Sequence, residues 1–396
     1  MTSWKTYTLK ELSKGKGEYG IGAPAVPFDK EKFTYLRITD INDDGTLNKS
    51  GLMSVDAEDA DRYLLSKNDI VFARTGNSTG RSYFYDGRDG ELVYAGFLIR
   101  FKLDEQKVNP KILKYYTHSK PYYDWVQSFD TGGTRGNINA KTYGDMPICL
   151  PPRHIQDRIA GILGAIDDKI ENNRRINTNL ELQAQALYKQ WFVDNRSDDW
   201  EEKQLGEIAL HITDGVHNTV IDSQQGEYYL LSCKNIKRGQ LFIGSNERRI
   251  DQETFARLRK RTRLSQGDIL VTSVGTVGEM YLVNEIPTNY EFQRSVAIIK
   301  PNQSIISSYF LYSALLYLQN EIKHLAHGAV QQCIFISDLK EYSLIVPNRS
   351  DISAFDAVVA PMFNKIGELQ KENETLATLR DTLLPKLMNG EIKVTE

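Results

Sequence analysis

The sequence lacks the cysteine pairs that a zinc site or a redox centre usually needs. Its 396 residues include three cysteines, Cys149, Cys233 and Cys333, and none of them forms a Cys-x-x-Cys pair. An odd number of lone thiols is typical of a reducing compartment, so we expect a cytoplasmic protein. The sequence has no run of about 18 apolar residues and opens without the apolar segment of a secretory signal. We therefore expect no contact with a membrane.

Motifs that carry catalysis are also missing. The chain has no P-loop, no Gly-x-Gly-x-x-Gly and no His-Glu-x-x-His pattern. Residues 76–80 (GNSTG) match the Gly-x-Ser-x-Gly pattern of hydrolases, but that motif needs a helix after it, whereas RSYFY here predicts a strand. Asp167 and Asp168 fit a solvated helix face better than a metal site. We expect no catalytic site, no metal and no cofactor.

An excess of positive charge, which would favour nucleic-acid binding, is likewise absent. The chain has 49 Lys and Arg against 52 Asp and Glu, for a net charge of −3. Two stretches, 155–199 and 350–396, each contain more acidic than basic residues and carry the net negative charge of the chain. The remaining sequence is close to neutral, so composition leaves DNA binding open without favouring it.

The most informative feature present is an internal repeat. Trp4 and Trp200 open similar segments, and 200 − 4 = 196. Residues 34–47 resemble 228–241, residues 67–85 resemble 266–283, and residues 132–152 resemble 327–347, at offsets within a few residues of 196. A period of half the chain indicates one module duplicated in tandem.

Each module is predicted to be α+β. Short β-like runs such as DIVFA (69–73) and DILVTSV (268–274) alternate with Gly- and Asn-rich turns, and helices are expected near 110–127 and 307–325. The strands and helices do not alternate as in a βαβ repeat.

A long amphipathic helix is predicted after each module. Apolar residues step by threes and fours from Ile155 through Ile162 to Trp191, and again from Phe355 to Leu387, as a coiled-coil seam requires. Asn177 and Asn373 occupy equivalent seam positions and are candidates for setting the register; a solvated edge of the seam is the alternative. Pro385 should kink or end the second helix.

These features predict an α+β protein in which two tandem-duplicated globular domains are joined by two long antiparallel coiled-coil helices with pseudo-two-fold symmetry. The expected parts are a first domain at 1–152, a first helix at 153–196, a second domain at 197–348 and a second helix at 349–396.

The helical segments resemble a known family. Residues 151–194 resemble the central conserved region, and residues 376–392 the distal conserved region, of the specificity subunits of Type I restriction-modification enzymes. The layout of two recognition domains, each followed by a conserved helix, is similar over the whole chain.

The resemblance implies a non-catalytic subunit that binds double-stranded DNA. Each recognition domain would read one half of a split target, and the helices would set the unread spacer. Two methyltransferase subunits would dock on the helices, and restriction subunits with translocase activity would join them. The alternative is a scaffold whose two heads bind proteins.

Base reading needs forked donors and amides on loops that approach the groove closely. Glycine-rich loops near residues 15–22, 74–81 and 131–137 satisfy this in the first domain, with their counterparts in the second. A basic run of Arg257, Arg259, Lys260, Arg261 and Arg263 suits phosphates, or is simply a solvated helix face. The candidate DNA-contacting residues are Arg74, Thr75, Asn77, Ser78, Thr79, Arg81, Thr134, Arg135, Asn137, His217, Asn218, Thr219, Arg261, Arg263, Ser273, Thr276, Gln331 and Gln332.

Overall fold

The computed structural model describes residues 4–49, 51–129, 136–217, 220–223, 225–244, 246–328 and 332–394. The chain divides into two compact units, the first made of Met1–Lys169 with Thr375–Glu396 and the second of Ile170–Glu374. Within the described residues, no helix combines the length and the apolar character needed to cross a membrane.

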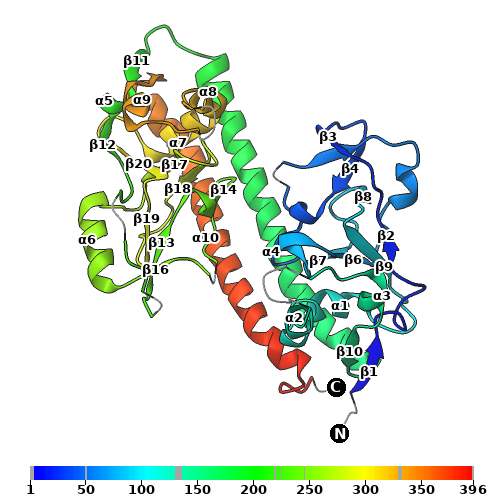
Figure 1. Ribbon diagram of the computed structural model, residues 1–396. Helices are drawn as coiled ribbons and strands as arrows, with labels where there is room; N and C mark the ends of the chain where they lie inside the picture. The colour runs from blue at the N-terminus through cyan, green and yellow to red at the C-terminus, as the bar shows by residue number, and fades with distance from the viewer. Residues whose placement is uncertain are drawn as a thin grey trace. The chain divides into compact units, whose positions relative to one another are not determined.

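The described residues of the first unit form three sheets and several short helices (Figure 1). Its four-stranded sheet has the order β2 (Glu18–Tyr19), β9 (Leu98–Lys102), β6 (Asp69–Ala73), β7 (Ser82–Tyr85). A second sheet has the order β3 (Ala25–Val26), β5 (Met53–Val55), β4 (Phe33–Leu36), β8 (Leu92–Tyr94), and β1 (Lys5–Thr8) pairs with β10 (Pro147–Leu150). The helices are α1 (Pro110–Tyr116), α2 (Lys120–Gln127) and α3 (Ala140–Gly144), with 3₁₀ turns η1 (Ile38–Asp40), η2 (Ala60–Tyr63) and η3 (Gly76–Ser78).

The second unit has corresponding sheets. Its four-stranded sheet has the order β12 (Ala209–Asp214), β20 (Val296–Pro301), β17 (Ile269–Thr272), β18 (Met280–Leu282). The others are β16 (Arg249–Ile250), β13 (Tyr228–Leu231), β19 (Tyr290–Phe292); the pair β11 (Glu201–Gln204) and β21 (Ser343–Val346); and the pair β14 (Ile236–Lys237) and β15 (Gln240–Leu241). The helical elements are α5 (Leu205–Ile208), η5 (Cys233–Asn235), α6 (Gln252–Thr262), α7 (Ser308–Tyr317), α8 (Gln319–His324) and α9 (Ile336–Glu341).

The predicted duplication and α+β class are confirmed at the level of strand pairing. In both units the central strand, β6 or β17, lies between a hairpin partner and a strand from later in the copy. In both, one parallel pair, β4 with β8 or β13 with β19, belongs to a separate sheet. The apolar run 92–101 (LVYAGFLIRF) forms two strands, β8 and β9, with a turn at Gly96 and Phe97.

Two long helices contribute to both units. Helix α4 (Arg153–Tyr188) has 36 residues and continues into a π-helical turn, η4 (Lys189–Asp194), whereas α10 (Arg349–Met388) has 40 residues. In the first unit, Ile159 and Leu163 near the start of α4 share a core with Leu384 and Leu387 near the end of α10.

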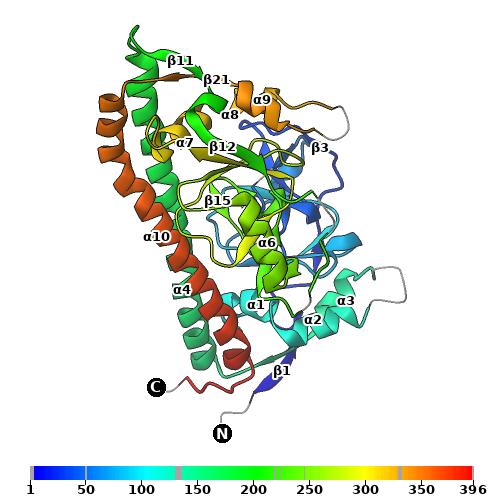
Figure 2. The same cartoon turned by 90° about the vertical axis from the view of Figure 1, so that its left-hand side faces the viewer.

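In the second unit, Ala184 and Tyr188 near the end of α4 share a core with Phe355 and Val359 near the start of α10. The helices are therefore antiparallel within each unit, as Figure 2 also shows.

The predicted seam needs one correction in the first unit. Ile162 is 40% exposed, whereas the neighbouring Leu163 is fully buried. An α-helix completes a turn every 3.6 residues, so positions that repeat every 3.5 residues move gradually around its surface. In this unit α4 also packs against α1, and Leu163 belongs to that shared core. Helix α10 ends at Met388, within one turn of Pro385.

The interpretation of Asp167 as solvated surface is wrong. Its carboxylate is mostly buried and binds Lys114 Nζ at 2.6 Å, the Tyr115 hydroxyl at 2.9 Å and Arg380 Nη1 at 3.3 Å. Burial raises the pKa of Asp167, but Lys114 and Arg380 outweigh it and hold the pKa below its ordinary value. This ion-pair network joins α1, α4 and α10 within the first unit.

Candidate nucleic-acid interface

The described parts of the three segments singled out in the first copy, 15–22, 74–81 and the residues from 136 on, meet at the end of its four-stranded sheet. The backbone N–H of Ile138 donates to the Arg74 carbonyl oxygen (3.0 Å), which joins the segment after 135 to the 74–81 loop. The Ala140 N–H donates to the Tyr19 hydroxyl (3.1 Å), which adds the glycine-rich segment 15–22. Segments that are distant in the sequence thus form one surface.

The 74–81 loop is a tight turn between β6 and β7. Gly76 and Gly80 have φ values of 72° and 86°, in the left-handed region that favours glycine. The Tyr122 hydroxyl donates to the Gly80 carbonyl oxygen (2.5 Å) and anchors the turn. Thr75 and Thr79 are half-buried and Asn77 is exposed.

Two candidates in this loop, Ser78 and Arg81, are engaged within the protein itself. Ser78 is buried, so its hydroxyl is not presented to a ligand, and RSYFY forms strand β7 after it, as expected against a nucleophile elbow. Arg81 is held by the Ile41 carbonyl oxygen at 3.0 Å and by the Asp43 carboxylate at 2.6 Å. Its charge is therefore already paired.

Arg74 differs from Arg81 in its surroundings. Its guanidinium lies over the Tyr19 ring, 5.1 Å from the centroid, and beside the Phe97 ring, 6.0 Å from the centroid. Both rings are exposed, at 43% and 56%. The surface therefore presents an arginine flanked by two aromatic side chains, an arrangement that stabilises the cation through its contact with the ring faces.

The second copy repeats the same backbone hydrogen bonds. Ile334 N–H donates to the Ser273 carbonyl oxygen (2.9 Å), as Ile138 does to Arg74. The Ser273 N–H donates to the Ser295 carbonyl oxygen (2.9 Å), as the Arg74 N–H does to the Phe97 carbonyl oxygen (3.1 Å). The two surfaces are therefore built on one frame, and they differ in their side chains.

The side chains of the second surface are polar and charged. The exposed His217 ring contacts the Asp214 carboxylate at 2.5 Å, and Arg261 Nη2 lies 3.2 Å from the same carboxylate. Thr276 is exposed, whereas Ser273 is buried and its hydroxyl donates to the Arg294 carbonyl oxygen (3.3 Å). The backbone N–H groups of His327 and Cys333 donate to each other's carbonyl oxygens (both 2.9 Å), next to the exposed Gln332.

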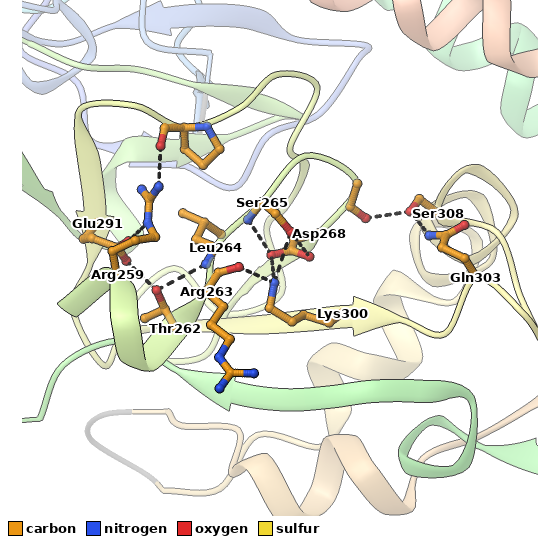
Figure 3. Close-up of polar contacts among 12 residues, drawn as sticks. Arg259, Thr262, Arg263, Leu264, Ser265, Asp268, Glu291, Lys300, Gln303 and Ser308 are labelled. Carbon is orange, nitrogen blue, oxygen red and sulfur yellow. Dashed lines mark hydrogen bonds and ion pairs between the residues drawn. The ribbon is translucent and has the colours of Figure 1, made fainter. Parts of the chain in front are cut away.

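The basic residues of α6 and its C-terminal end have different surroundings in the fold. Arg259 binds the fully buried Glu291 and the carbonyl oxygens of Pro287 (2.6 Å) and Tyr290 (3.0 Å), so it is neither a phosphate contact nor a solvated residue (Figure 3). Burial raises the pKa of Glu291, and the Arg259 guanidinium opposes that shift.

Arg263 ends α6 with a left-handed φ of 50°. Its carbonyl oxygen accepts from Lys300 Nζ (2.6 Å), and Figure 3 shows its guanidinium pointing away from that contact. Arg263 is exposed, so its side chain remains available to a ligand.

Five candidates lie outside the described residues: Thr134, Arg135, Asn218, Thr219 and Gln331. Sequence reasoning also missed Phe97 and Arg294, which occupy corresponding turns before β9 and β20. Arg294 is exposed, and its N–H donates to the Val216 carbonyl oxygen (3.1 Å), beside His217. Aligning the two copies across these turns would have identified both, because the turns interrupt otherwise apolar strands.

Comparisons with known proteins agree with the duplicated layout. A family model described as Type I restriction modification DNA specificity domain matches residues 1–182 and again residues 197–371. The chain is 27% identical over 303 residues to the Type I restriction enzyme MjaIX specificity subunit of Methanocaldococcus jannaschii, covering 72% of this chain and 69% of that protein. It is 22% identical to the Type I restriction enzyme HindI specificity subunit of Haemophilus influenzae, covering 99% and 100%.

A solved structure has a similar fold. The crystal structure of a Type-I restriction-modification system S subunit from M. genitalium matches with a TM-score of 0.54 and 19% identity, over 98% of this chain and 96% of that one. At this identity the match supports the fold.

Proposed function

The chain belongs to the Type I restriction modification DNA specificity family, and we propose that it is the subunit that reads a bipartite DNA target for such an enzyme. Each recognition domain reads one half-site. The observation that carries this proposal is one hydrogen-bonded loop frame built twice, with different side chains on each copy.

Duplicated frames with different side chains suit a split target. A shared frame brings each set of loops to DNA in the same way, and different side chains select different bases. We assign DNA contact to the candidate residues, other than the paired Arg81, that are not buried or that lie outside the described residues: Arg74, Thr75, Asn77, Thr79, Thr134, Arg135, Asn137, His217, Asn218, Thr219, Arg261, Arg263, Thr276, Gln331 and Gln332.

The long helices set the gap between half-sites in this proposal. We divide the chain into recognition domains at 1–152 and 197–348 and helices at 153–196 and 349–396, with Asn177 and Asn373 helping to set the register. Antiparallel packing within each unit supports a stiff connection between the domains.

The catalytic chemistry comes from partners. We propose that two methyltransferase subunits dock on the helices, that restriction subunits with translocase activity join them, and that the enzyme works in the cytoplasm. Exposed apolar side chains on the helices, Ile162, Leu182, Val358 and Leu379, support such docking because they make contacts available to a partner. The specificity chain itself supplies neither a catalytic group nor a cofactor.

The test is to co-express the chain with the methyltransferase encoded beside it and to map methylated adenines in the host DNA. Two short half-sites separated by a constant gap are expected. A continuous motif would contradict the bipartite proposal. No methylation together with no stable complex of the two proteins would favour the scaffold with protein-binding heads.

A further inference from the structure

The Arg74 guanidinium has unused hydrogen-bonding capacity. Its Nε is buried without a hydrogen-bond partner, and no acceptor in the described part of the chain is bound to its terminal nitrogens. A guanidinium carries five N–H donors. Arg81 in the same loop is paired with Asp43, whereas Arg74 has no carboxylate partner among the described residues.

The two aromatic rings restrict how this guanidinium can lie. The Tyr19 ring is itself anchored, because its hydroxyl accepts from the Ala140 N–H (3.1 Å). Phe97 lies in the turn between β8 and β9, and its carbonyl oxygen accepts from the Arg74 N–H (3.1 Å). The two rings thus hold the guanidinium, and the hydrogen bond to Phe97 holds the backbone of Arg74. Less side-chain conformational entropy is then lost when the guanidinium binds a planar acceptor.

We propose that Arg74 reads a guanine in the half-site bound by the first recognition domain, donating two parallel hydrogen bonds to guanine O6 and N7 in the major groove. Tyr19 and Phe97 are positioning residues that hold the plane of the guanidinium. The inference rests on the proposed DNA-reading function and adds the base and the residue that reads it.

Guanine fits this geometry better than phosphate does. A phosphate contact requires positive charge near the backbone and is well served by a mobile lysine or arginine. A bidentate contact with a base edge requires a fixed fork, which is why arginine paired with guanine is the commonest specific contact in protein–DNA complexes. Two rings that fix the fork contribute little to a phosphate contact.

The second domain does not repeat this arrangement. Ser273 takes the place of Arg74 in the shared frame, Ser295 takes that of Phe97, and the segment of Tyr19 corresponds to that of Asp214. The proposed contact of Arg74 with guanine therefore has no counterpart at the same position of the second domain.

The experiment uses the complex of the full chain with its methyltransferase and the target found by methylation mapping. Each guanine of the first half-site is replaced in turn by 7-deazaguanine, which lacks the N7 acceptor. Wild-type affinity should fall about 5- to 150-fold at one guanine. Arg74→Ala should bind the unmodified target with a comparable loss and should show no further loss at that guanine.

Two variants separate charge from shape. Arg74→Lys keeps the positive charge but lacks the planar fork, so it should lose affinity for the cognate target nearly as Arg74→Ala does. Arg62→Ala, which removes an exposed arginine from η2 of the same unit, is the matched control and should retain the wild-type response to 7-deazaguanine.

The positioning role of Phe97 is tested by the effect of Phe97 variants on the affinity lost at 7-deazaguanine. Phe97→Leu should weaken the response to 7-deazaguanine at that guanine, and Phe97→Tyr should restore it, because a tyrosine ring offers a similar face. A purely structural role would leave that response unchanged in any variant that folds.

The inference fails if Arg74→Ala reduces affinity equally for cognate and random duplexes, or if every 7-deazaguanine substitution affects the wild type and Arg74→Ala alike. It also fails if the first half-site contains no guanine. These results differ from failure of the proposed function, in which the wild-type complex would neither methylate nor bind a specific sequence.

Discussion

At the scale of single residues, two equivalent glycines allow the backbone to approach a neighbouring strand closely. A Cβ at Gly20 would lie 2.3 Å from the carbonyl oxygens of Tyr94 and Ala95, and a Cβ at Gly215 would lie 2.1 Å from that of Phe292. Both contacts are far inside van der Waals distance. A glycine at each of these two positions therefore lets the chain after β2 and β12 pass close to the backbone of its own unit.

We predict that Gly20→Ala destabilises the first unit by about 1–3 kcal/mol, the usual cost of forcing atoms into a packed site. Urea unfolding measures the difference. Gly22→Ala is the control, because a Cβ there would meet no atom within 4 Å. Equal stability of the two variants would contradict this prediction, because it would show that the backbone at Gly20 can move away from the carbonyl oxygens of Tyr94 and Ala95.

His118 provides a pH-dependent contribution in the first unit. Burial lowers the pKa of this half-buried histidine to about 4, with Asp44 opposing the shift. In the unfolded chain the pKa is about 6.5. Between these values the unfolded chain binds more protons, so the contribution of His118 to stability is present above pH 6.5 and is lost as the pH falls toward 4.

The stability of the wild type relative to His118→Gln should therefore decrease as the pH falls from about 7 to about 4. Chemical unfolding of both proteins at several pH values measures this difference. A constant difference across that range would mean that His118 protonates equally easily in both states.

Glu181 in the second unit should behave in the opposite way. Burial raises its pKa to about 7, while the Tyr312 hydroxyl, which donates to Glu181 at 3.3 Å, lowers it. Glu181 thus favours the folded state at low pH, and that contribution is lost as the pH rises from about 4.5 through about 7. Relative to Glu181→Gln, the wild type should become less stable over that interval, as unfolding at the same pH series would reveal; an unchanged difference would contradict the raised pKa.

At the scale of elements, the helix seam contains buried amides with unequal partners. Asn173 donates through Nδ2 to Asn373 Oδ1 and to Glu372, both at 2.9 Å. Asn177, 3% exposed, has neither its amide nitrogen nor its amide oxygen bound to any described residue. Asn173 therefore makes the side-chain hydrogen bonds between the two helices. The buried Asn177 amide lowers the stability of the fold, because it lost its bonds to water without gaining a partner among the described residues.

We predict that Asn177→Leu raises the thermal midpoint, because an unsatisfied buried amide costs about 1–3 kcal/mol. Asn173→Leu should lower the midpoint, since it leaves Asn373 without its donor. Calorimetry on the two variants compares them directly. A lower midpoint for Asn177→Leu would indicate that this amide is bound in solution.

At the scale of the whole molecule, the proposed role of the helices can be tested by length. Inserting seven residues into each helix, between 169 and 170 in α4 and between 374 and 375 in α10, preserves the seam repeat. The insertions add about 10 Å at about 1.5 Å per residue. At about 3.4 Å per base pair, the unread gap should grow by about three base pairs.

Methylation mapping of the lengthened protein in complex with its methyltransferase gives the new gap. Both half-sites should stay the same, because the recognition domains are untouched. A lengthened protein that methylates the original target with its original gap would contradict the proposal that the helices set the spacing.

Sequence and structure contributed differently to the candidate site. The loops were found from sequence because glycines at positive φ, such as Gly76 and Gly80, leave a visible pattern between apolar strands. Their convergence was not visible, since it depends on contacts such as that of Ala140 with Tyr19, 121 residues apart. Phe97 was missed because an aromatic residue between two strands reads as part of the strand.

The sequence by itself determined the duplication, the α+β class, the two long helices and the family, because each leaves a periodic or contiguous record along the chain. Tertiary structure decided which arginines are free to meet DNA. Arg81 and Arg259 are paired with Asp43 and Glu291, whereas the Arg74 guanidinium lies over an aromatic ring and has no carboxylate partner among the described residues. A charge that a neighbouring carboxylate already neutralises is less available for binding, and that depends on which distant residues the fold brings together.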